Sequence, residues 1–79
     1  MTLENLNNWI CGGKDRCWMI FNHEKDMSDC DNKIAELWTP HTLFGNNYDK
    51  WTNSELIKKQ VKTFRASGWQ ANVYYVVLK

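Results

Sequence analysis

Residues 69–78, with the sequence WQANVYYVVL, form the densest run of β-branched and aromatic side chains in the chain. Residues of these types favour a β-strand. From Val73 onward both faces of that strand are largely apolar, which is typical of a strand covered on both sides. The stretch therefore predicts a central or covered strand.

A second strand is predicted at residues 16–22, RCWMIFN. Successive side chains of a strand point to opposite faces. Both faces are apolar here, with Cys17, Met19 and Phe21 on one and Trp18 and Ile20 on the other. Two strands are too few for a stable sheet, so we expect a third strand or completion of the sheet in a homodimer.

The clearest helical pattern covers residues 53–67. Thr52 and Glu55 have the spacing of a capping box, and Gly68 is placed to end the helix. The side chains with the spacing of one inward face are Leu56, Ile57, Gln60, Val61 and Phe64. The outer faces carry Lys58, Lys59, Lys62 and Arg65.

Two further helices are expected. Residues 2–10 place Leu3, Leu6 and Ile10 on one face, behind Thr2 as the cap. Residues 27–38 are ambiguous: as a helix they begin at a possible cap, Ser28, and end before a proline at position 40, whereas a strand over residues 34–38 would alternate poorly, so the helix is preferred. Residues 39–51 read mostly as a loop, with residues 41–44 as a possible short strand.

The chain has 79 residues, which is one domain. The element order predicts an α+β fold over residues 1–79, with about three helices packed on a two- to three-stranded sheet. The net charge of +1 conceals an asymmetry. Residues 1–49 contain four Lys or Arg and eight Asp or Glu, whereas residues 50–79 contain six basic residues and one acid, Glu55.

The three cysteines do not form a metal-binding pattern. Cys11, Cys17, His23 and Cys30 offer ligand types that zinc accepts, but the close Cys pair of structural zinc sites is missing. A Cys11–Cys17 disulfide across the intervening glycines remains a less favoured alternative. No export signal is recognised, so we expect a cytoplasmic protein with reduced thiols and no cofactor.

No catalytic motif is recognised either. The sequence has no glycine-rich phosphate loop, no Gly-x-Ser-x-Gly and no His-Glu-x-x-His. Residues 24–31 are acidic but lack the pattern of a calcium loop. We therefore expect a protein that is not an enzyme, and no apolar run is long enough for a membrane span.

Binding of a protein partner is the favoured hypothesis. Aromatic anchors in a loop suit such an interface, and the expected anchors are Trp38, Phe44, Tyr48 and Trp51. The alternative is a nucleic-acid-binding module that uses the basic 53–67 helix, with Lys58, Lys59, Lys62 and Arg65 on phosphates. A sequence pI near 7.7 argues against that alternative.

In size, aromatic content and lack of a catalytic motif, the chain resembles the small inhibitor proteins of phages and mobile elements, anti-CRISPR proteins among them. The resemblance covers no particular segment and transfers no residue. It implies a protein that antagonises a host enzyme or defence complex in the host cytoplasm by blocking it.

Overall fold

The computed structural model describes residues 1–10, 16–39 and 46–79, and the side chains of all of these except 46–49. Within them the chain forms two α-helices, three short 3₁₀-helices (η) and four strands. In chain order these are α1 (Leu3–Ile10), β1 (Arg16–Phe21), η1 (Glu24–Ser28), η2 (Cys30–Asn32), β2 (Ala35–Thr39), α2 (Asn46–Asn53), η3 (Glu55–Lys58), β3 (Val61–Ala66) and β4 (Val73–Leu78).

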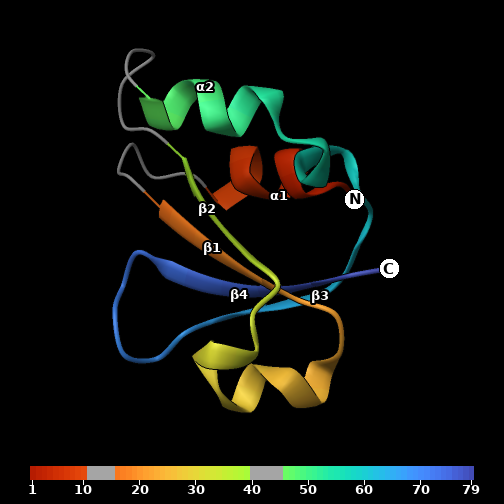
Figure 1. The fold of residues 1–79 in the computed structure, drawn as a ribbon, viewed down its shortest axis with the longest axis vertical. Coiled ribbons are helices and arrows are strands. Elements are labelled where there is room, and N and C mark those ends of the chain that lie inside the picture. The colour runs from red at the N-terminus through yellow and green to blue at the C-terminus, as the bar shows by residue number, and fades with distance from the viewer. Residues whose placement is uncertain (11–15, 40–45) are drawn as a thin grey trace.

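The four strands form one sheet in the order β2-β1-β4-β3. The two central strands, β1 and β4, are parallel, and each is flanked by an antiparallel edge strand. Figure 1 shows α1 and α2 on one side of the sheet and the short turns of η1 and η2 on the other. The predicted α+β class is confirmed, but the expected count of two to three strands is wrong.

Both central strands were predicted, because their composition alone marks them as covered. All six residues of β1 are buried. Residues 16–22 are confirmed apart from the last, and residues 69–78 form a strand only from Val73. Each central strand needs a hydrogen-bonding neighbour on both sides. The chain supplies these neighbours itself, as β2 and β3.

The helix predicted over residues 53–67 is wrong. That segment contains the end of α2, then η3 and then β3. Ser54 rather than Thr52 caps the turn that follows, through its hydroxyl and the Leu56 amide. The periodic apolar residues fit a helix locally, but β-branched and aromatic residues also suit a strand beside β4, and the open side of β4 decides between them.

The helix predicted over residues 27–38 is also wrong. Its first half contains the end of η1 and all of η2, where Asp29 accepts a hydrogen bond from the amide of Asp31. Its second half is β2, whose Ala35 and Leu37 turn toward the helices while Glu36 and Trp38 turn away. Residues 39–51 are likewise not all loop, since α2 begins at Asn46. The possible strand at 41–44 lies outside the described residues.

The helix predicted over residues 2–10 is confirmed as α1. The Thr2 hydroxyl accepts a hydrogen bond from the amide of Asn5, as expected of a cap. Leu3 and Leu6 are fully buried. Arg16 closes the other end of the helix, because its guanidinium donates to the carbonyl of Ile10.

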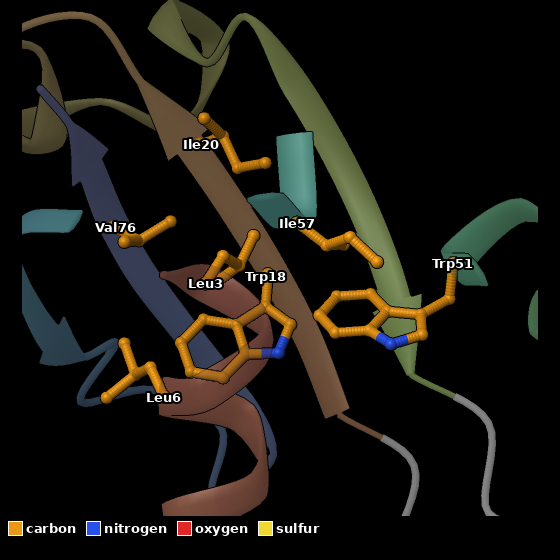
Figure 2. Packing of buried hydrophobic residues seen from close by; sticks show 7 residues of the cluster. All are labelled: Leu3, Leu6, Trp18, Ile20, Trp51, Ile57 and Val76. Carbon is orange, nitrogen blue, oxygen red and sulfur yellow. The ribbon is translucent and has the colours of Figure 1, made fainter. Parts of the chain in front are cut away.

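The core has two parts, one on each face of the sheet. The part under the helices is the larger in side-chain volume, and Figure 2 shows the indole of Trp18 among Leu3, Leu6 and Trp51. Trp18 is fully buried, and its ring N–H donates to Asn7 Oδ1 at 3.1 Å. The part under η1 and η2 consists of Cys17, Met19, Phe21, Val73, Tyr75 and Val77.

Candidate functional site

The four aromatic residues predicted as anchors do not form one surface among the described residues. Trp38 lies on β2 with 36% of its surface exposed. Trp51 is 7% exposed and packs in the core, so it offers no docking surface. Phe44 lies outside the described residues, and Tyr48 lies in α2 among those whose side chains are not described.

The four basic residues predicted as one helix face are divided between two sides of the sheet. Lys58 and Lys59 lie at the end of η3, in the layer that contains α1. Lys62 Nζ lies 4.0 Å from Glu24 Oε1, and Arg65 donates to the carbonyl of Met27, so both reach η1 in the opposite layer. The continuous basic face that the nucleic-acid hypothesis used is therefore not formed.

An aromatic pair that the sequence analysis did not select lies on the outside of the molecule. Trp9, near the end of α1, is 69% exposed, and Phe64 on β3 is 37% exposed. Their ring centroids lie 6.5 Å apart with an angle of 89° between the planes, an edge-to-face contact. The helical spacing offered one signal for this pair, because it leaves Trp9 off the stripe of Leu3, Leu6 and Ile10.

The hydrogen bonding of the exposed tryptophans distinguishes Trp9 from the others. The indole N–H of Trp38 donates to Glu36 Oε1 at 3.0 Å, and that of Trp69 donates to Tyr75 Oη at 2.8 Å. Among the described residues, the Trp9 indole has no hydrogen-bond partner. A solvent-exposed ring with an unused donor is the kind of side chain that protein interfaces bury.

The apolar surface around this pair continues along β3. A groove of about 270 Å³ is lined by Met1, Val61, Lys62, Thr63 and Phe64. Met1 is 56% exposed. We call the group formed by Met1, Trp9, Val61 and Phe64 the Trp9–Phe64 surface.

A second group of side chains, on the opposite face of the sheet, connects parts of the chain to one another. Tyr75 Oη accepts the Trp69 hydrogen bond and lies 2.9 Å from Cys30 Sγ. The Cys30 contact, followed by burial, raises the pKa of Tyr75 above its ordinary value. Arg65 stacks over the Tyr75 ring at 5.3 Å. Because the phenol is already used by two partners, this group holds η2 and the β3–β4 connection to the sheet.

The buried thiol of Cys17 is in an environment that lowers its reactivity. Burial, and then the nearby Glu36 carboxylate, raise the pKa of Cys17 to about 12. The thiol donates to Glu36 Oε1 at 3.5 Å. The nucleophilic form of a cysteine is the thiolate, which this environment disfavours. Cys17 and Cys30 are both free thiols, whereas Cys11, the other half of the alternative Cys11–Cys17 disulfide, lies outside the described residues.

We expect Cys17 to resist alkylation in the folded protein. With a pKa of about 12, the thiolate fraction of Cys17 at pH 8 is about a thousandfold below that of an unperturbed thiol. Labelling by iodoacetamide at pH 8, followed by peptide mass spectrometry, should be at least that much slower in the folded protein than in urea. Glutathione in the same reaction controls for reagent quality, and labelling of folded Cys17 at the unfolded rate would contradict the assignment.

Across residues 1–10, 16–39 and 46–79, no three His, Cys, Asp or Glu side chains gather as ligands for a metal ion. In the same residues, neither helix has the length and apolar character required to cross a membrane.

Comparison of the chain with protein-family models, with curated proteins and with solved structures finds no match.

Proposed function

We propose that the protein acts without catalysis, by binding a protein partner through the Trp9–Phe64 surface and thereby blocking or modulating that partner. The observation that carries the proposal is the exposed edge-to-face pair of Trp9 and Phe64. Tryptophan is the residue most enriched among the few side chains that dominate binding energy at protein interfaces.

The structure of this pair supports a binding role over a purely structural one. Trp9 projects from α1 over β3, yet most of its surface remains open to solvent. Burial of apolar surface contributes about 25 cal/mol per Å², so an exposed indole leaves much stabilisation unused in the free protein. A partner that covers Trp9 and Phe64 would recover it.

The proposal extends to the class of partner. The resemblance in size and composition to small phage inhibitors supports a host enzyme or defence complex in the cytoplasm as the target, blocked by occlusion of a site. Nucleic-acid binding stays a prediction, but the basic 53–67 helix on which it was based is not formed.

Capture of partners by the tagged protein tests the proposal. The tagged chain is incubated with a lysate of the cell in which it is made, in parallel with Trp9→Ser and Ile34→Ser variants. Ile34 is a matched control because it is 51% exposed and lies away from the Trp9–Phe64 surface, beside η2. We expect one stoichiometric protein that survives nuclease and raised salt, is retained by the Ile34 variant and is lost with Trp9→Ser.

Two outcomes would contradict the proposal. If the Trp9 variant captured the partner as well as the parent does, the interface would lie elsewhere on the protein. Recovery of nucleic acid alone, lost on nuclease treatment or at raised salt, would favour the alternative function, because phosphate contacts weaken steeply with salt.

A further inference from the structure

We propose that the partner contributes an extended segment, with apolar and acidic residues in alternation, that adds to the sheet as a new strand beside β3. This inference rests on the proposed function and specifies how the partner is recognised. Addition of a strand to an exposed sheet edge is a general mode of peptide recognition, in which backbone hydrogen bonds give affinity and alternate side chains give specificity.

β3 presents an open edge. In the described residues it is the last strand of the sheet, and its neighbouring strand is β4. Ser67 donates its amide to the Val73 carbonyl, and Arg65 pairs with Tyr75 in the same register. Since backbone groups alternate in direction along an antiparallel strand, those of Thr63 and Arg65 face β4. Those of Phe64 and Ala66 therefore face the open side.

The N-terminal residues of the chain already form hydrogen bonds with the start of this edge. The Val61 amide donates to the Met1 carbonyl at 2.8 Å, and the Leu3 amide donates to the Lys59 carbonyl at 3.1 Å. Thr2 forms an antiparallel bridge with Gln60. The N-terminal residues thus begin a fifth row of strand pairing. In the described residues that row ends at Val61, where the groove lined by Met1 and Phe64 begins.

The two sides of β3 differ in the side chains that they present. On the side of α1, Phe64 packs against Trp9. On the side of η1, Lys62 approaches Glu24 and Arg65 lies over the Tyr75 ring. In a strand that pairs with this edge, every second side chain would point to the α1 side, toward Trp9 and Phe64. The side chains between them would point to the η1 side, toward Lys62 and Arg65. Side chains that alternate between apolar and acidic match both sides.

The charge of the edge also decides between occupants. β3 itself contributes positive charge alone, from Lys62 and Arg65, and the acid beside it, Glu24, lies on η1 with its Oε1 4.0 Å from Lys62 Nζ. Pairing of β3 with the β3 of a second copy would bring Lys62 and Arg65 of both chains together, and like charges across paired strands are destabilising. An acidic segment is favoured over a second copy.

A synthetic peptide tests this mode directly. The probe is an eight-residue peptide, capped at both ends, in which glutamate alternates with valine and phenylalanine. It is titrated into ¹⁵N-labelled protein. We expect amide shift changes centred on Phe64 and Ala66, and slower hydrogen exchange at these two amides. A peptide of the same composition with its glutamates adjacent, and one N-methylated at every second amide, should each bind at least about fivefold more weakly.

A charge-reversal pair tests the recognition of acid. Lys62→Glu should weaken binding of the alternating peptide by about fivefold, and Lys50→Glu, the same change at an exposed position on α2, should have little effect. Equal weakening by the two variants would overturn the acidic specificity.

The remaining outcomes separate this inference from the proposed function. If no peptide shifts Phe64 or Ala66 while Trp9-dependent capture of a protein persists, strand addition is wrong and the proposed function stands. Binding of a labelled oligothymidylate, but of no peptide, at this edge would overturn both. Concentration-dependent dimerisation through β3, detected by sedimentation, would overturn the choice of occupant.

Discussion

The Trp18→Ala variant is expected to lose a large part of its unfolding free energy at 25 °C. Trp18 is fully buried in the larger part of the core, between β1 and both α-helices. Truncation of a buried tryptophan to alanine costs about 3–5 kcal/mol, through lost burial and the cavity left behind. A domain of 79 residues has a total stability of about 4–12 kcal/mol. The substitution therefore removes a large part of what holds the fold.

Two matched variants separate this effect from the loss of an indole as such. Trp18→Phe keeps a ring but leaves Asn7 Oδ1 without its donor, and should cost about 1–3 kcal/mol. Trp9→Ala removes an exposed indole and should change stability by less than about 1 kcal/mol. Urea unfolding followed by circular dichroism gives all three values. A Trp18→Ala protein as stable as Trp9→Ala would show that the core is not where we place it.

The second large effect is expected in binding. Trp9→Ala and Phe64→Ala should each weaken the complex with the captured partner by about 30-fold or more, which corresponds to about 2 kcal/mol. Both residues are exposed in the free protein, so the variants should keep the unfolding free energy of the parent within about 1 kcal/mol. Titration calorimetry with the purified partner gives the affinities.

Trp38→Ala is the control for this series. Trp38 was one of the four anchors predicted from the sequence and is 36% exposed, but its indole N–H is already bound to Glu36. We expect a change in affinity of less than about threefold. If Trp38→Ala costs more than Trp9→Ala, the interface lies on the β2 side of the sheet and the Trp9–Phe64 surface is not the site.

The parts of the fold that were predicted correctly are those decided by local sequence. The cap at Thr2 and the spacing of Leu3 and Leu6 specify α1 without reference to the rest of the chain. The apolar side chains on both faces around Trp18 and Val76 specify two covered strands in the same way. These segments carry one pattern each, so local and tertiary preferences agree.

The edge strands were missed because their sequences carry two compatible patterns. In residues 61–66 the spacing of Val61 and Phe64 fits a helix turn, while the β-branched and aromatic residues of VKTFRA suit a strand. The need of β4 for a second hydrogen-bonding neighbour selects the strand, and that need is visible only once the sheet order is known. The same holds for β2 beside β1.

The candidate site was missed for a related reason. A helix over residues 53–67 turned Phe64 inward, away from any surface, and so concealed its contact with Trp9, which lies 55 positions earlier in the chain. Trp51 was expected in a loop and lies instead in α2, against the core. A pair formed between a helix and a distant edge strand leaves no spacing in the sequence that would reveal it.

Hydrogen–deuterium exchange of the protein with and without its captured partner tests the central claim most directly. If the partner binds the Trp9–Phe64 surface, we expect slower exchange in the complex in β3 and in the last turn of α1, centred on Phe64 and Trp9. Exchange in η1 and η2 should be unchanged. Slower exchange confined to η1, η2 or β2, with β3 unchanged, would contradict this claim and place the interface on the other face of the sheet or at its β2 edge.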